Sequence, residues 1–184
     1  MGTRLTPFAH DSRRAADTCA LSLKWSFQLL LDLGGHRNLI SRHGFNDDDL
    51  AREVGLAKWV DRDEYSPPQA LSALRRAARA FEASNPDTPY PDRLGSNLEA
   101  LGTLLGLEET ELRVLGFCVL MHIDPVLCDA TDQLGMVGFN RAMKVLAVLL
   151  GLQLPEVEAC LASNSPLIRA GLLEVGSNSQ MEEH

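Results

Sequence analysis

The feature that most constrains this chain is a leucine-rich segment in which a single glycine separates two stretches of helical periodicity. Residues 98–125 read LEALGTLLGLEETELRVLGFCVLMHIDP. Leucines recur three and four residues apart, which predicts a helix with one buried stripe; they are Leu94, Leu98, Leu101, Leu104 and Leu105. Gly106 stands where a helix ends in a left-handed residue, and the acids after it favour the start of a second helix. We therefore expect a helical hairpin at the centre of the core.

The same pattern returns 45 residues later, because residues 146–157 (LAVLLGLQLPEV) align without gaps on residues 101–112 (LGTLLGLEETEL). Six positions are identical: Leu101, Leu104, Leu105, Gly106, Leu107 and Glu111 align with Leu146, Leu149, Leu150, Gly151, Leu152 and Glu156. Two copies could begin a helical solenoid, but such arrays normally need three or more units. The sequence therefore predicts two similar hairpins packed together, with a repeat array as the alternative.

The composition favours helices over sheets. Aromatic residues make up 5% of the 184 residues, so the core must consist mainly of leucine, alanine and valine. Leucine and alanine are strong helix formers, whereas sheets favour aromatic and β-branched residues. We expect an all-α fold in which helical hairpins pack into a single bundle-like or orthogonal domain.

The positions of the remaining helices are predicted from capping residues and from the glycines and prolines that end helices. We expect helices at residues 11–33, 37–42, 48–54, 67–83, 139–150 and 155–162, and a short helix after Ser165 and Pro166. Residues 85–93 hold three prolines and predict a loop. This loop divides an N-terminal helical subdomain (residues 1–84) from a C-terminal one (94–175), which is followed by a polar tail (176–184). Residues 129–138 predict a loop, and residues 172–175 a short extended piece.

The charge is unevenly distributed. The net charge is −8; residues 1–82 carry 12 Lys/Arg against 11 Asp/Glu, and residues 83–184 carry 5 against 14. This balance argues against a general nucleic-acid or anionic-membrane binder. Four widely spaced cysteines predict free thiols in a reducing compartment, and no run approaches the roughly 20 apolar residues of a membrane span. We expect a cytoplasmic protein that does not enter membranes.

Catalytic and metal sites find little support. Cys118, His122, Asp124 and Cys128 could in principle bind zinc, but they match no C-x-x-C spacing. The acids at residues 47–49 lack the spacing of a calcium loop, and helix capping explains them. No GxxxxGK[ST] phosphate loop occurs. We therefore predict no catalytic residues, no metal and no cofactor, and a chain that is not itself an enzyme.

A DNA-binding helix-turn-helix is the alternative interpretation. Ala51 and Gly55 resemble the first helix and turn of that motif. The candidate nucleic-acid residues are Lys58, Trp59, Arg75, Arg76 and Arg79. Against this hypothesis, the second helix would also carry Asp61, Asp63 and Glu64, which repel phosphate. We therefore expect protein partners, with a DNA-binding regulator as the alternative.

Three segments carry a family resemblance: HRNLISRHGFNDDDLAREVGL, NLEALGTLLGLEETELRVLGFCVLMHIDP and LAVLLGLQLPEVEACLASNSPLIRAGLLEV. They lie within residues 36–175 and resemble the N-terminal helical domain that precedes the ATPase module of bacterial AAA-type ATPases. The resemblance implies a non-catalytic domain that recruits substrates or partners for an attached ATPase module. The Walker motif of such a module is absent from these 184 residues, and both an excised domain and a stand-alone relative fit.

Overall fold

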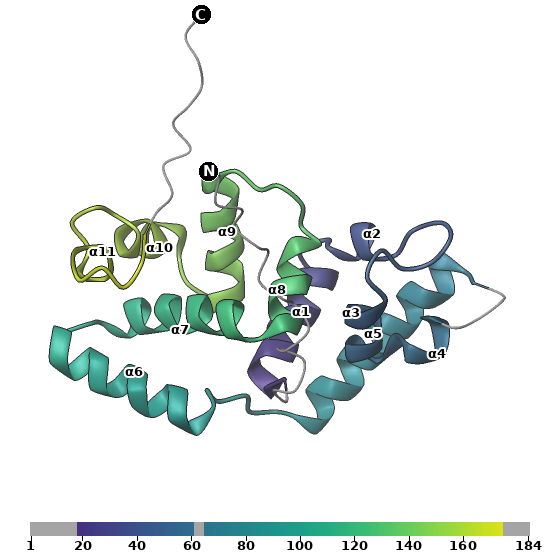
Figure 1. The fold of residues 1–184 in the computed structure, drawn as a ribbon, viewed down its shortest axis with the longest axis horizontal. Helices are drawn as coiled ribbons and strands as arrows, with labels where there is room; N and C mark the ends of the chain where they lie inside the picture. Colours follow the sequence, from purple (N-terminus) through teal and green to yellow (C-terminus); the bar gives the residue numbers. More distant parts are fainter. Residues whose placement is uncertain (1–17, 61–64, 175–184) are drawn as a thin grey trace, which may run out of the picture.

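The computed structural model describes residues 18–60 and 65–174, and the fold is all-α (Figure 1). The first helices are α1 (Ala20–Leu31), α2 (His36–Leu39), α3 (Asp48–Ala51), the π-helical turn η2 (Arg52–Leu56), α4 (Ala57–Val60) and α5 (Pro67–Ser84). The others are α6 (Asp92–Leu105), α7 (Glu109–Ile123), α8 (Pro125–Asp132), α9 (Phe139–Leu150), α10 (Leu154–Cys160) and α11 (Pro166–Arg169). The described residues contain no strand beyond an isolated bridge between Ile40 and Phe45.

Helices α1 and α8 form the centre of the fold, where Figure 1 shows them side by side. Small side chains let the two backbones approach, since Ser22 and Ser26 of α1 and Ala130 of α8 are fully buried. The Ser26 hydroxyl donates to the Ser22 carbonyl at 2.8 Å, which satisfies the buried polar group within its own helix. Helix α8 was not expected from the sequence, so this central pair is a finding of the structure.

Asp124 explains why α8 was missed. The Asp124–Pro125 pair predicts the end of a helix, yet it is a 96° bend between α7 and α8. The Asp124 carboxylate accepts from the backbone N–H of Val126 and Leu127, and proline is tolerated as the first residue of α8. Its other oxygen accepts from the Cys19 N–H at 3.4 Å. One buried carboxylate therefore caps α8 and ties it to the start of α1.

The predicted pair of similar hairpins is confirmed. Helix α6 ends at Gly106 (φ 66°, ψ 37°) and α9 ends at Gly151 (φ 59°, ψ 37°), both in the left-handed region that favours glycine. The next helix of each pair starts with a capping box. The Glu108 N–H donates to the Glu111 carboxylate at 2.9 Å, and the Gln153 N–H donates to that of Glu156 at 2.6 Å.

The central position predicted for the first hairpin is only half right. Helix α7 is buried along Val114, Leu115 and Phe117, as expected. Helix α6 instead packs chiefly on α7 and lies at the edge of the molecule (Figure 1). Its Leu104 is 79% exposed and its Leu105 is 38% exposed, so the predicted leucine stripe is not buried as a whole.

Other boundaries also differ from the prediction. Helix α1 begins at Ala20, because Cys19 is extended and its Sγ accepts from the Ser22 N–H. The predicted helical residues 11–17 lie outside the described part of the chain. The extended piece at residues 172–175 is wrong over its described part, because the N–H groups of Leu172 and Leu173 fold back onto the Leu167 carbonyl. The predicted polar tail, residues 176–184, lies outside the described residues.

The proline-rich loop is observed before Asp92, where α6 begins. A division into two subdomains at this loop stays a prediction. The described helices share one apolar core, in which α1 packs against α8 and α9 from the other side of the loop. In the two described ranges, no single helix is both long and apolar enough to cross a membrane; α7 and α8 meet those criteria only as a bent pair.

Candidate functional site

The tip of α6 carries exposed leucines, and we define Leu104, Leu105 and Gly106 as the α6 end. Leu104 and Leu105 are 79% and 38% exposed. A side chain built on Gly106 would meet no atom within 4 Å, so the space beyond this helix terminus is open. Scattered apolar residues are normal on protein surfaces, but two adjacent leucines at an open helix end form a local patch.

The second hairpin supplies an internal comparison, because Leu149, Leu150 and Gly151 occupy the same positions. We define these three residues as the α9 end; its leucines are 5% and 3% exposed. The leucines that follow the two glycines do not differ in this way, because Leu107 and Leu152 are each 8% exposed. The difference in leucine exposure therefore lies at the two helix ends.

Helices α1 and α7 flank the α9 end. Leu21 and Trp25 of α1 line a cleft of about 500 Å³ together with all three residues of the α9 end. An Arg113 side-chain N–H donates to the Leu150 carbonyl, and its guanidinium lies 3.8 Å from a side chain built on Gly151. Helix termini leave their last carbonyls without intrahelical partners, and a cation complements the dipole there. The α9 end is therefore flanked by the apolar residues of α1 and by the Arg113 side chain.

The cleft itself carries mixed charge. Lys24 and Arg113 bring positive charge and Glu109 negative charge, while the Gln28 Oε1 is buried without a hydrogen-bond partner. Tyr90 forms part of the wall, and burial raises the pKa of its phenol, although the nearby Arg113 opposes that shift. These groups do not define one ligand class.

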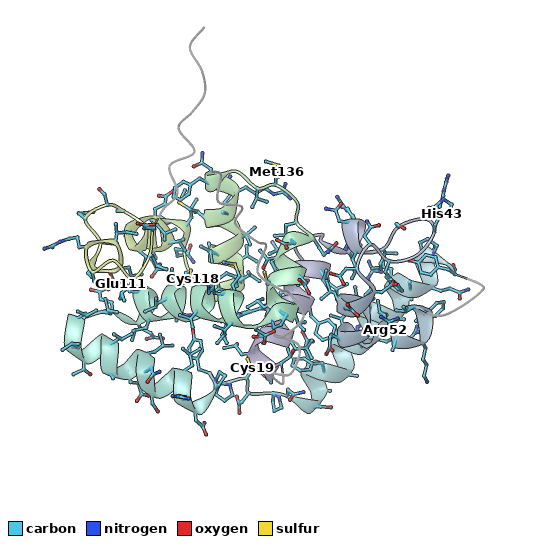
Figure 2. All side chains as sticks on the ribbon, in the orientation of Figure 1. Cys19, His43, Arg52, Glu111, Cys118 and Met136 are labelled. Carbon is cyan, nitrogen blue, oxygen red and sulfur yellow. The ribbon has the colours of Figure 1, made fainter. Side chains whose placement is uncertain are left out.

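The cysteine, histidine and aspartate set around the α7–α8 bend does not converge on one point. Cys118 is half-buried on α7 (Figure 2), and burial raises the pKa of its thiol to about 11. His122 and Cys128 are exposed, whereas Asp124 is a buried helix cap. In the described part of the chain, no group of three His, Cys, Asp or Glu residues could hold a metal ion. None of the four cysteines forms a disulfide.

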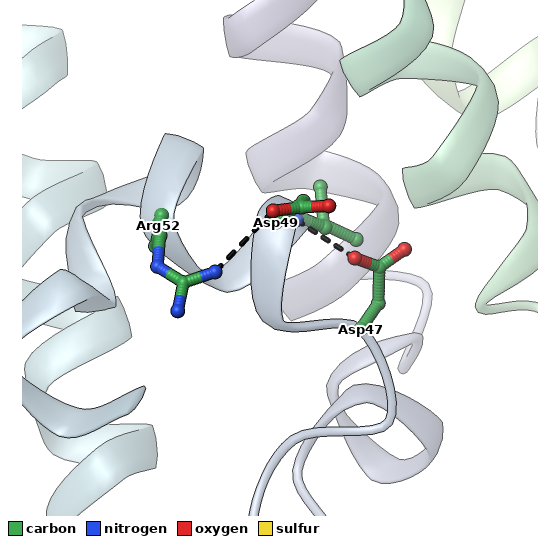
Figure 3. A network of polar contacts seen from close by, with 4 residues as sticks. Asp47, Asp49 and Arg52 are labelled. Carbon is green, nitrogen blue, oxygen red and sulfur yellow. Dashed lines mark hydrogen bonds and ion pairs between the residues drawn. The ribbon is translucent and has the colours of Figure 1, made fainter. Parts of the chain in front are cut away.

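Of the acids at residues 47–49, Asp47 has the capping role that the sequence predicts. The Asp47 side chain accepts from the Leu50 N–H at 2.8 Å and caps α3 (Figure 3). Asp49 pairs with Arg52 at 3.3 Å on the surface. Helix capping and a local ion pair therefore account for both acids.

The candidate nucleic-acid residues lie on α4 and α5. Lys58, Arg75, Arg76 and Arg79 are exposed, but Trp59 is half-buried against the core. Gly55 (φ 83°) interrupts the helical backbone before α4, and a side chain built there would lie 3.2 Å from Ala77 of α5. Helix α4 has four residues, and the acids at positions 61, 63 and 64 lie outside the described residues. The helix-turn-helix reading stays a prediction.

Sequence reasoning missed the α6 end because periodicity marks Leu104 and Leu105 as buried, like their equivalents in the second hairpin. The local sequences are too similar to separate the two ends. Comparison of the chain with protein-family models, curated proteins and solved structures found no match.

Proposed function

We propose that this chain is a non-catalytic domain that binds partner or substrate proteins for an AAA-type ATPase. The observation that carries the proposal is the α6 end, where two leucines that are buried in the equivalent hairpin face solvent. Exposed apolar side chains at a defined position are typical of surfaces that protein partners cover. The resemblance of residues 36–175 to the region preceding an ATPase module supports the connection to such an enzyme.

The sequence features also favour binding over catalysis. Gripping a triphosphate takes a cradle of backbone N–H groups and a lysine on the phosphates, usually within a GxxxxGK[ST] loop. This sequence contains no such loop. We therefore expect isothermal titration of the chain with ATP and magnesium to give no heat of binding, and micromolar binding would contradict the proposed role.

Site-specific photo-crosslinking tests the proposal directly. A photoreactive residue replaces Leu104 in the full chain, and a second protein carries it at Met136. Met136 is a fully exposed apolar residue on the connection between α8 and α9 (Figure 2). We expect protein conjugates at position 104 that are absent at position 136. Recovery of nucleic acid alone, or of the same proteins at both positions, would count against the proposal.

A DNA-binding role is the second candidate, and the exposure of Arg75, Arg76 and Arg79 on α5 favours it. Binding to duplex DNA at physiological ionic strength, weakened by salt and lost on replacing the three arginines with glutamine, would promote it. The net charge of −8 predicts that no such binding occurs.

A further inference from the structure

We propose that the α6 end binds a cationic amphipathic helix from a partner protein. That helix places apolar side chains on Leu104 and Leu105, and an arginine or lysine at the last carbonyls of α6. The inference rests on the proposed function and adds the chemistry of the partner. Its basis is the covered α9 end, where the same chain already makes both contacts.

The apolar contact follows from the paired exposures. Leu104 corresponds to Leu149 and is 79% exposed against 5%, while Leu105 corresponds to Leu150 and is 38% exposed against 3%. At the α9 end, α1 contacts α9, and its Leu21 and Trp25 line one cleft with the buried leucines, so a helix fits this geometry. A helix presents apolar residues to such a surface at positions three and four apart.

The cationic contact follows from the helix terminus. Arg113 donates to the Leu150 carbonyl at the α9 end, and Lys24 of α1 lines the same cleft. At the α6 end the corresponding space beside Gly106 is open. The α6 terminus carries partial negative charge, and the exposed acids Glu108 and Glu109 follow it in the chain. The Glu108 side chain accepts from the backbone of α7 in the capping box, so the Glu109 carboxylate is the acid outside that box. A cation is therefore the complementary group there.

The other charges near this surface do not reverse that preference. Glu111 is buried and its carboxylate is engaged in the capping box of α7. Arg93 lies on the same side of α6 as Leu104 but 11 residues earlier, about 16 Å along the helix. It therefore repels only the far end of an incoming helix. The negative charge at the α6 terminus therefore determines that the preferred partner group is a cation.

A foreign helix fits better than a second copy of this chain. The net charge is −8, with 14 acids against 5 bases in residues 83–184. Two copies meeting through this half would bring like charges together, whereas a cationic segment would gain attraction. Charge complementarity thus selects the partner class.

The test uses two fluorescein-labelled model peptides of about 18 residues with identical leucines at helical spacing. One peptide carries lysine and arginine at the remaining positions, and the other carries glutamate. Fluorescence anisotropy with the full chain should show binding of the basic peptide alone, weakening as salt rises. Leu104→Ser should raise its Kd at least about tenfold, and Leu104→Lys should raise it further by repulsion. Met136→Ser is the matched control and should leave Kd unchanged.

Several other outcomes would overturn the inference. Equal binding of the two peptides, no binding of the basic one, or no effect of Leu104→Ser would remove its chemical basis. Self-association lost in Leu104→Ser, measured by sedimentation velocity, would make a second copy the occupant. Crosslinked partners that contact position 104 through acidic or non-helical segments would sink this inference while leaving partner binding intact. Peptide binding without any crosslinked protein would instead contradict the proposed function and leave this inference standing.

Discussion

The contact between Gly116 and Tyr90 decides how the proline-rich loop is held on α7. An ideal Cβ on Gly116 would lie 2.6 Å from the Tyr90 hydroxyl oxygen and 2.7 Å from two ring carbons. The ring also packs against Trp25, since its centroid lies 6.4 Å from that of Trp25 in an edge-on arrangement. Gly116→Ala must therefore displace the Tyr90 ring.

Two opposing effects set the size of the change. Alanine in place of glycine within a helix stabilises by about 1 kcal/mol. Forcing a methyl group into a filled site costs about 1–3 kcal/mol. We expect Gly116→Ala to lower the free energy of unfolding by about 0–2 kcal/mol, the difference of the two. In a Tyr90→Ala background the clash is absent, so the same substitution should raise stability by about 1 kcal/mol.

Urea unfolding followed by circular dichroism measures all four proteins of this double-mutant cycle. The expected coupling energy is about 1–3 kcal/mol, the size of the clash alone. Gly95→Ala is the matched control, because its new methyl group would meet the Tyr90 Cβ at an ordinary 3.8 Å. It should stabilise both backgrounds alike.

The refuting result is a vanishing coupling. If Gly116→Ala stabilises the parent as much as it stabilises Tyr90→Ala, the tyrosine does not lie against α7. The loop would then be attached to the helices in some other way, and our description of the loop contact would be wrong.

Three further predictions concern the core and its thiols. Asp124→Ala should cost about 1–3 kcal/mol in urea unfolding, because α8 loses its cap and the tie to α1, whereas Asp124→Asn keeps one acceptor and should cost less. Leu115→Ala should cost about 2–5 kcal/mol and Leu104→Ala no more than about 0.5 kcal/mol, since the first is 3% exposed and the second 79%; equal losses would contradict the description of α6. A pKa of about 11 keeps the Cys118 thiol protonated at pH 8, so mass spectrometry should find it alkylated far more slowly than the exposed Cys128, with a rate that rises with pH; equal rates would contradict its burial.

Most helices could be predicted because their signals are local. The capping residue Asp47 and the glycines that follow α6 and α9 act within a few residues of the backbone that they control. The exception was α8, whose start at Asp124–Pro125 reads equally well as a helix end. Only tertiary packing decides between a helix start and a helix end at this position, because α8 is stabilised by burial against α1.

The sequence could not predict which of the candidate nucleic-acid residues on α4 and α5 share an exposed surface. Lys58 and the arginines of α5 were identified from charge alone, and charge does not report which side chains meet. Trp59 illustrates the limit, since it was grouped with these basic residues but lies half-buried against the core.

The sequence by itself determined that this chain forms two similar helical hairpins. Their left-handed glycines and capping boxes are closed by hydrogen bonds between residues at most five apart. Only the tertiary structure decided which hairpin end is covered. Leu104 and Leu149 stand in nearly the same local sequence, but α1 and Arg113 arrive at the α9 end from elsewhere in the chain. Burial depends on those distant partners, which the periodicity of a single helix does not specify.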